Sequence, residues 1–138
     1  MALEMNDAVR RLLDAPYPAV LSTLNPDGSP QSSVVWVSRD GAELLISTTR
    51  DRRKARNVLR DPRVSLSVFD MADPNVYVEI RGTATVTEDT DRAMAVRIAE
   101  EYEGPGAGKE YLEAPPEVIR VVVRITPTKL LGNAARTT

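Results

Sequence analysis

The sequence predicts a single, mostly β domain, namely a small antiparallel barrel of roughly six strands with short helices. The chain has 138 residues, which is enough for one hydrophobic core and too few for two ordinary domains. Its apolar residues fall in short runs, several of which alternate with polar residues at the two-residue period of a half-buried strand. Turn-forming sequences join the first runs directly, as expected of antiparallel neighbours. We therefore expect residues 1–138 to form one domain.

The composition limits the chemistry that the side chains can perform. There is no cysteine and no histidine, which excludes thiolate nucleophiles, disulfides, serine–histidine dyads and nearly every zinc or haem ligand set. We therefore expect no metal site, and any redox chemistry has to come from a bound cofactor. The 18 basic and 20 acidic residues give a formal charge of −2, so no global attraction to nucleic acid or to an anionic membrane is expected. The absence of a membrane-length apolar run and of a basic-then-apolar leader predicts a cytoplasmic protein.

The first part of the chain predicts a helix followed by a β-hairpin. Residues 3–14 have the apolar spacing of a short amphipathic helix, which Pro16 would stop. A strand then covers Ala19–Leu24. Asn25-Pro26-Asp27-Gly28 has the residue preferences of a type I turn, with asparagine first, proline second and glycine fourth. We therefore expect residues 31–37 to return as the antiparallel partner of the first strand.

This return strand has apolar residues on both faces. Val34 and Trp36 point to one side, and the two valines that flank Trp36 point to the other. A last strand, expected at residues 118–125, is also apolar on both faces except at Arg120 and Arg124. Because a small barrel covers only one face of its strands, the second face predicts a homodimer.

An apolar strand at residues 44–49 leads into a strongly basic helix at residues 52–60. Asp51 stands where an N-cap belongs. The first turn would then contain three cations, each destabilised by about 0.3–1 kcal/mol because the positive end of the helix dipole repels it. A bound phosphate would reverse the sign of this effect by accepting hydrogen bonds from backbone and side-chain donors. The three cations are Arg52, Arg53 and Lys54.

Hydroxyl side chains at the end of the strand favour a phosphate site. Ser47, Thr48 and Thr49 directly precede the turn into the helix, and small hydroxyls donate to phosphate oxygens. The alternative is that these hydroxyls satisfy backbone groups at the strand end and that the basic helix is an ordinary solvated surface. The residues spaced to form the packing stripe of the helix are Ala55, Val58 and Leu59.

Asp61-Pro62 ends the basic helix, and the rest of the chain predicts strands, one helix and loops. Alternation indicates strands at residues 64–68 and 76–86, and Gly82 marks a bulge in the second. The remaining expectations are a helix at residues 88–102, a loop at 104–108, irregular structure at 111–117 and a frayed tail at 132–138.

Five segments of the sequence together resemble a known family. They are Pro26-Asp27-Gly28-Ser29-Pro30, Trp36, Ile46-Ser47-Thr48, Arg52-x-Lys54-x-x-Asn57 and Asp61-Pro62-Arg63-Val64. This set is similar to the pyridoxamine 5′-phosphate oxidase-like split barrels, and most similar to their subgroup called the PPOX class of probable F420-dependent enzymes. The matched segments lie in the first two-thirds of the chain, and the last third matches less well.

The resemblance implies a six-stranded antiparallel split β-barrel that forms a homodimer with two cofactor sites at its interface. Members of the family hold FMN or the deazaflavin coenzyme F420. On this sequence, Arg52 and Lys54 would grip the cofactor phosphate. Ser47, Thr48 and Thr49 would donate to the phosphate or the ribityl chain, and Ile46 belongs to the same motif. Asn57 would support the loop. Gln31, Ser33 and Trp36 would lie at the edge of the ring site.

The function implied is that of an oxidoreductase that binds reduced coenzyme F420 and passes its hydride to a small conjugated organic acceptor. Exposed arginines such as Arg50, Arg53 and Arg56 favour F420 over FMN, because F420 carries an anionic oligoglutamate tail. One alternative is an FMN-binding flavin reductase or oxidase, and another is a cofactor-binding protein without turnover. A nucleic-acid binder is disfavoured by the overall acidity and by the lack of aromatic residues among the arginines. No side chain is singled out as catalytic, and Trp36 has packing as an equal alternative.

Overall fold

The chain folds into seven strands and several short helices, which a computed structural model describes for residues 3–136. The strands are β1 (Ala19–Leu24), β2 (Pro30–Val35), β3 (Ser38–Asp40), β4 (Glu43–Thr49), β5 (Arg63–Phe69), β6 (Tyr77–Glu88) and β7 (Arg120–Leu131). The helices are α1 (Asp7–Asp14), α2 (Arg53–Arg60), the 3-10 turn η1 (Thr90–Arg92), α3 (Ala93–Glu103), α4 (Lys109–Glu113) and α5 (Asn133–Arg136). None of these helices is both long enough and apolar enough to cross a membrane.

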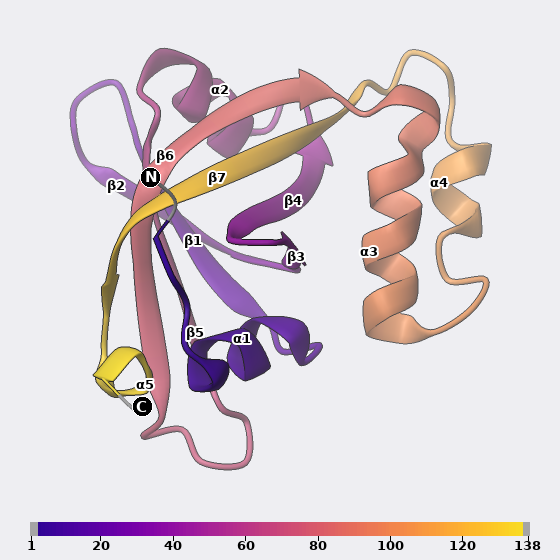
Figure 1. The fold of residues 1–138 in the computed structure, drawn as a ribbon. Helices are drawn as coiled ribbons and strands as arrows, with labels where there is room; N and C mark the ends of the chain where they lie inside the picture. The colour runs from indigo at the N-terminus through magenta and orange to yellow at the C-terminus, as the bar shows by residue number, and fades with distance from the viewer. Residues whose placement is uncertain (1–2, 137–138) are drawn as a thin grey trace.

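All seven strands pair antiparallel in one sheet with the order β2-β1-β5-β6-β7-β4-β3. The two edge strands, β2 and β3, are consecutive in the chain, and only Trp36 and Val37 separate them. A connection this short spans only about 10 Å, so the sheet has to curl until its edges approach one another. Within the described residues no ladder joins β2 to β3, and the result is a barrel that stays open along one seam (Figure 1).

The count of seven strands corrects the expectation of six. The expected return strand at residues 31–37 ends at Val35, and Trp36 and Val37 lie outside any strand before Ser38–Asp40 forms β3. A tight turn at Gly41, whose φ is 62°, then pairs β3 with the start of β4, and glycine adopts this left-handed conformation without steric cost. The sequence pattern indicates one strand as far as residue 37 because the apolar run 34–37 continues past the end of β2.

The inner side of the barrel is the hydrophobic core. In β5, Val64, Leu66 and Val68 are buried while Ser65 and Ser67 are partly exposed, which confirms the alternation expected for this strand. Other large side chains with almost no exposed surface come from the neighbouring strands and include Leu21, Leu44, Ile46, Ile80 and Ile125.

Strands β6 and β7 form a long pair of 12 residues each and run along one side of the barrel (Figure 1). Their register shifts between Arg81 and Gly82, with Pro127 opposite Gly82. A Cβ atom at Gly82 would lie 2.3 Å from the carbonyl oxygen of Thr126, so only glycine fits without movement of the backbone. The bulge predicted at Gly82 is confirmed.

Helix α3 begins at Ala93 and not at residue 88, because β6 continues to pair with β7 as far as Glu88. The carboxylate of Asp89 accepts hydrogen bonds from the backbone N–H groups of Met94 and Ala95, both at 2.9 Å. Four other expected boundaries change. The helix expected at residues 3–14 starts at Asp7, and the strand expected at 118–125 runs from Arg120 to Leu131. The segment 111–117, expected to be irregular, contains part of α4, and the tail expected to be frayed contains α5, while its residues 137–138 lie outside the described range.

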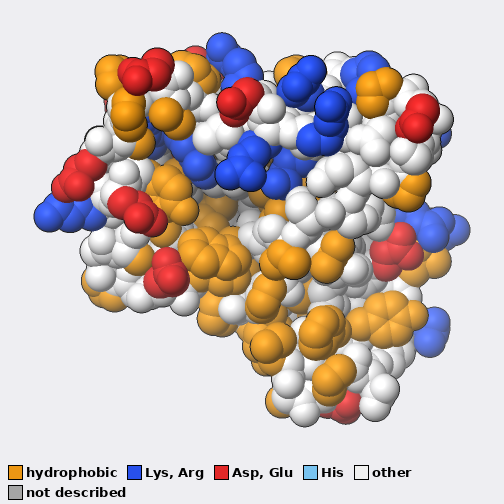
Figure 2. Space-filling model, turned by 180° about the vertical axis from the view of Figure 1, so that it is seen from behind, with side chains coloured by type: hydrophobic (Ala, Val, Ile, Leu, Met, Phe, Trp, Pro, Cys, Tyr) orange, Lys and Arg blue, Asp and Glu red, His pale blue; other side chains and the backbone are white. Residues whose placement is uncertain are grey.

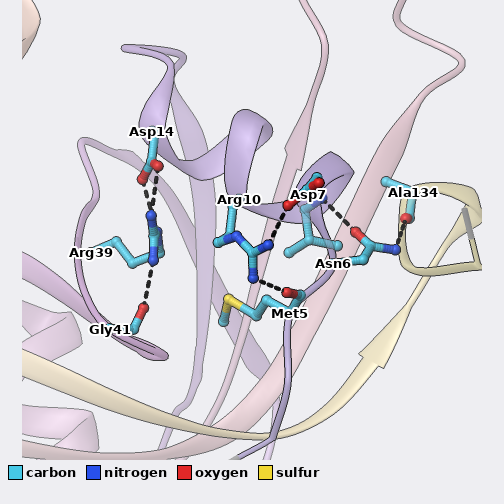
Figure 3. A network of polar contacts seen from close by, with 9 residues as sticks. Met5, Asn6, Asp7, Arg10, Asp14, Arg39, Gly41 and Ala134 are labelled. Atoms are coloured by element: carbon cyan, nitrogen blue, oxygen red, sulfur yellow. Dashed lines mark hydrogen bonds and ion pairs between the residues drawn. The ribbon is translucent and has the colours of Figure 1, made fainter. Parts of the chain in front are cut away.

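Helix α1 lies at the end of the barrel opposite α2 (Figure 1) and ties the two ends of the chain together. Its N-cap Asn6 accepts from the N–H of Val9 at 2.8 Å and donates to the carbonyl of Ala134 at 2.9 Å. At the other end of α1, Asp14 forms a two-bond ion pair with Arg39 of β3 at 2.8 and 2.6 Å (Figure 3). These contacts fix the β3 edge of the barrel and leave the opposite end for the candidate site.

Candidate functional site

Helix α2 begins one residue later than the sequence indicates, which corrects the expectation that Asp51 is its N-cap. The N-cap is Arg52, with φ −68° and ψ 146°, and no side chain caps the helix. Asp51 instead accepts a hydrogen bond from the hydroxyl of Thr49 at 2.9 Å. The first turn, which starts at Arg53 and Lys54, contains no acidic residue. The N-terminal N–H groups of α2 therefore have no side-chain acceptor from the cap position.

The inner face of α2 holds Ala55, Asn57 and Val58, all buried. Leu59, expected in the packing stripe, is instead 63% exposed. Asn57 takes the corresponding buried place because its amide has partners there: it donates to Thr23 Oγ1 and to Asn25 Oδ1, each at 3.0 Å. These two hydrogen bonds satisfy the buried amide group of Asn57. A leucine at this position could not form them.

Asn57 therefore connects α2 to the strand β1 and to the hairpin turn that follows it. Asn25 begins that turn, and the N–H of Gly28 donates to the Asn25 carbonyl at 2.8 Å, as a type I turn requires. Asn57 thus supports the hairpin turn, and its expected support of the cofactor-binding loop stays a prediction. A direct contact between Asn57 and a cofactor stays a prediction.

A cavity of about 250 Å³ opens beside the N-terminal end of α2. In the view of Figure 2, lysine and arginine side chains gather along the rim of a hollow whose floor is hydrophobic. Three of the predicted site residues line the cavity: Trp36, Ser47 and Lys54. The other lining residues are Val34, Val35, Ala95, Ile98, Tyr111 and Arg120.

The two faces of β4 separate the residues of the strand-end motif. Ser47 and Thr49 share one face, and Ile46 and Thr48 share the other. Ile46 is fully buried in the core and Thr48 is 6% exposed, so neither side chain lines the cavity. Ser47 is the hydroxyl residue of the motif that does.

Gln31 and Ser33 lie on the same face of β2 as the core residue Val35. The side-chain oxygen of Gln31 accepts a hydrogen bond from Thr23 at 2.9 Å, which joins it to the Thr23–Asn57 contact. The hydroxyl of Ser33 is buried and has no hydrogen-bond partner among the described residues. A buried hydroxyl of this kind is available to a ligand.

Trp36 forms an aromatic wall of the cavity. Its ring stacks on Tyr102 of α3, with centroids 5.0 Å apart and planes inclined by 12°. The Tyr102 hydroxyl accepts from the N–H of Val37 at 2.9 Å and donates to the carbonyl of Tyr17 at 2.8 Å. Burial raises the pKa of Tyr102, which keeps this hydroxyl protonated. Trp36 thus packs on α3 with one face and is held rigid at the cavity wall.

Arg120, at the start of β7, completes the cationic side of the cavity. Its Nη2 donates to the hydroxyl of Ser47 at 2.7 Å, and its guanidinium lies 4.8 Å from the ring centroid of Tyr111. Its Nε is buried and has no hydrogen-bond partner among the described residues. The sequence contained one signal for this residue, since Arg120 interrupts an otherwise apolar strand. Its place in the site depends on pairing with Thr49 of β4 across 70 intervening positions, which no local pattern reveals.

The cations of the site repel one another. Burial lowers the pKa of Lys54, and the positive charges of Arg52 and Arg120 lower it further. Burial also lowers the pKa of Arg120. Within residues 3–136, no ion pair involves any of these three side chains. Lys54 and Arg120 are partly buried, whereas Arg52 is exposed, and partly buried cations without an ion-pair partner favour a bound anion.

The side chains therefore suit a planar ligand with an anionic group. Lys54, Arg120 and the hydroxyl of Ser47 supply donors at one end of the cavity, and Trp36 supplies a flat apolar wall. No group of three or more acidic side chains able to hold a metal ion is found in residues 3–136.

A comparison with protein families matches residues 5–133 to the pyridoxamine 5′-phosphate oxidase model. Among individual proteins, the chain is 33% identical over 94 residues to the pyridoxine/pyridoxamine 5′-phosphate oxidase of Rubrobacter xylanophilus. The match covers 66% of this chain and 43% of that protein, so the chain spans less than half the length of this relative.

Two solved structures are similar over most of their length. An F420 reductase has a TM-score of 0.74 and 30% identity, with 88% of this chain and 94% of that chain covered. A conserved hypothetical protein from Mycobacterium tuberculosis has a TM-score of 0.74 and 26% identity, with coverages of 93% and 84%. These comparisons confirm the resemblance inferred from the sequence motifs.

Proposed function

Since the chain belongs to the pyridoxamine 5′-phosphate oxidase family, a family of flavin-binding oxidoreductases, we propose that it is an oxidoreductase that uses reduced coenzyme F420. Its substrate is a small conjugated organic acceptor. The observation that carries this proposal is the cavity itself, in which unpaired cations at one end adjoin a rigid indole wall. A deazaflavin or flavin with a phosphate on its side chain has the matching shape and charge.

The phosphate end of such a cofactor fits the basic residues. Lys54 lies in the first turn of α2 and Arg52 at its N-cap, where a phosphate also meets unsatisfied backbone N–H groups. The hydroxyl of Ser47 adds a donor in the cavity lining. The buried hydroxyl of Ser33 has no hydrogen-bond partner among the described residues and directly precedes Val34 and Val35, which line the cavity. Burial, together with the charges of Arg52 and Arg120, lowers the pKa of Lys54, and an anion bound beside its ammonium group would oppose both effects.

The ring end fits the apolar residues. Trp36, fixed by Tyr102, provides a flat surface, and Ala95 and Ile98 of α3 are buried and exclude water from the same cavity. The bound cofactor supplies the hydride, and the protein supplies position and electrostatics. This division of labour accounts for a sequence without histidine or cysteine.

Two observations favour F420 over FMN. The similar F420 reductase is matched over nearly its whole length. In addition, Arg53 and Arg56 are exposed on α2 and suit an anionic tail, whereas Arg50 is already paired with Glu88 at 3.3 Å. An FMN-dependent reductase or oxidase is the second candidate, because the same cavity accepts the phosphate of either cofactor.

The assembly proposed for this function is a homodimer. Val34 on the edge strand β2 is 68% exposed, and its cross-strand neighbour Val20 is 38% exposed. Leu59 on α2 is 63% exposed. Apolar side chains left in water beside a candidate site support a second copy of the chain as their cover.

The test is a parallel fluorescence titration of the protein with F420 and FMN, followed by an assay of F420H2 oxidation with quinone and enone acceptors. We expect Lys54→Ala to weaken cofactor binding about tenfold to a hundredfold, the loss of one charge-assisted contact to a phosphate. Lys129→Ala is the control, since Lys129 is exposed on β7 opposite Arg81. Arg60 is unsuitable as a control, because it bonds to Asn57 and to the carbonyl of Leu24.

The outcomes separate the alternatives. Binding of FMN without F420 would replace the proposed cofactor by the second candidate. Tight binding of F420 without turnover of any acceptor would indicate a cofactor carrier. Equal, small effects of the two lysine substitutions would mean that the basic helix is an ordinary solvated surface.

A further inference from the structure

Arg120 lies beside the turn from β4 into α2, although it is 68 residues later in the chain than Arg52. In the β4–β7 ladder Arg120 pairs with Thr49, the last residue of β4. The N–H of Arg50 donates to the carbonyl of Ile119 at 2.9 Å, which continues this alignment past the strand end. The sheet therefore fixes the backbone of Arg120 next to the segment proposed to hold the phosphate.

The contacts of the Arg120 side chain orient it without using up its donors. A guanidinium carries five N–H donors in a rigid plane. One contact goes to Ser47 Oγ at 2.7 Å, and the face of the plane lies over the ring of Tyr111. Nε is buried and has no hydrogen-bond partner in the described part of the chain. Because Ser47 accepts this hydrogen bond, its own hydroxyl hydrogen stays available to a ligand.

Another arginine of the same strand shows what a structural role looks like. Arg124, four residues along β7, donates to Glu43 at 2.8 Å and to Asp40 at 3.3 Å. Both contacts are ion pairs. Arg120 has no such pair in residues 3–136, although the negative charge of Asp89 attracts it, and it lies beside Lys54 in the cavity lining. A partly buried cation that no carboxylate contacts is costly, and a ligand anion offsets the cost.

We infer that Arg120 is a third cationic ligand of the cofactor phosphate, held in position by Ser47 and Tyr111. This inference rests on the proposed function, and it adds a residue from the last strand to the basic residues of α2. The planar guanidinium can donate two parallel hydrogen bonds to a phosphate, which the ammonium group of Lys54 cannot. Arg120 thus recognises the phosphate in a fixed orientation, and Lys54 supplies charge.

The experiment compares two ligands that differ only in the phosphate, FMN and riboflavin, by fluorescence titration of the wild-type protein and three variants. F420 and its phosphate-free deazaflavin chromophore are titrated in the same way. The variants are Arg120→Gln, Arg120→Lys and Arg11→Gln. Arg11 is exposed on α1, at the other end of the barrel, so it controls for the loss of one positive charge.

For Arg120→Gln we expect the phosphate-bearing ligand to bind about tenfold to a hundredfold more weakly, with the phosphate-free ligand unaffected. Arg120→Lys should restore only part of the difference, and Arg11→Gln none of it. The thermal midpoint of the ligand-free protein should change little in Arg120→Gln, because the lost contacts to Ser47 and Tyr111 are offset by removal of a buried positive charge.

Two results would overturn the assignment of Arg120 alone. In the first, wild-type protein binds a cofactor and Arg120→Gln keeps the same ratio of the two affinities. In the second, the variant weakens both ligands equally, which would indicate a purely structural role. If wild-type protein binds neither FMN nor F420, the proposed function falls, and the assignment of Arg120 falls with it.

Discussion

The amide of Asn57 joins α2 to β1 and to the turn that follows it, and replacing Asn57 by alanine tests how far the position of α2 depends on these contacts. The side chain is fully buried, and its Nδ2 donates to Thr23 Oγ1 and Asn25 Oδ1, each at 3.0 Å. Its oxygen accepts from Arg60 at 3.2 Å. Asn57→Ala removes all of these contacts and leaves a small cavity between α2 and β1.

The size of the effect follows from these contacts. Each lost hydrogen bond to a neutral group costs about 0.5–1.5 kcal/mol, and the truncated side chain adds a cavity term. Thr23 keeps its hydrogen bond to Gln31, so its hydroxyl is not left wholly without a partner. We expect a total loss of about 2–4 kcal/mol in the free energy of unfolding, or about 6–12 °C in thermal midpoint for a domain of this size.

The assay is thermal and urea-induced unfolding monitored by circular dichroism, at one protein concentration because association would shift the midpoint. Arg56→Ala is the control, since Arg56 is exposed on the same helix, and its midpoint should change little. Cofactor affinity should also fall in Asn57→Ala, because Lys54 belongs to α2 and loses its fixed position when the helix is less firmly held. A loss below about 0.5 kcal/mol, the level of an ordinary surface substitution, would refute the claim that Asn57 anchors α2.

Three further outcomes follow from single positions. Gly82→Ala should destabilise the protein by about 1–3 kcal/mol or more, because the new methyl group would lie 2.3 Å from the Thr126 carbonyl oxygen; urea unfolding measures this. Hydrogen bonds from Arg63 lower the pKa of Asp61 from 3.8 to about 2, so its contribution to stability is present above the unfolded-state pKa and disappears as the pH falls toward 2. Unfolding of Asp61→Asn should therefore depend less on pH between 4 and 2. Val34→Lys should convert the proposed dimer to a monomer in light scattering coupled to size exclusion.

Each of these outcomes has its own control. Thr83→Ala changes an exposed residue beside Gly82 and should leave the urea midpoint nearly unchanged; an equally stable Gly82→Ala would contradict the bulge geometry. An unaltered acid profile in Asp61→Asn would show that the Arg63 contact does not contribute to acid stability. A wild-type protein that is monomeric at low micromolar concentration would remove the argument from exposed Val34.

Local sequence determined those features that neighbouring residues decide by themselves. The turn at Asn25–Gly28 depends on the preferences of four consecutive residues, and the structure contains it. The alternation in β5 follows from the two-residue period of a strand with one buried face. The glycine at position 82 marks a bulge because no other residue fits there. The family motifs lie in short segments, so they could likewise be identified from the sequence alone.

Only the tertiary structure decided which side chains meet. Leu59 was expected to pack, but the buried place on α2 belongs to Asn57, whose partners lie in β1 and its turn, more than 30 positions away. Arg120 enters the candidate site because β7 pairs with β4. The physical reason is the same in both cases: hydrogen bonds and burial between distant segments outweigh the local preferences of a helix or strand, and no sequence period records them.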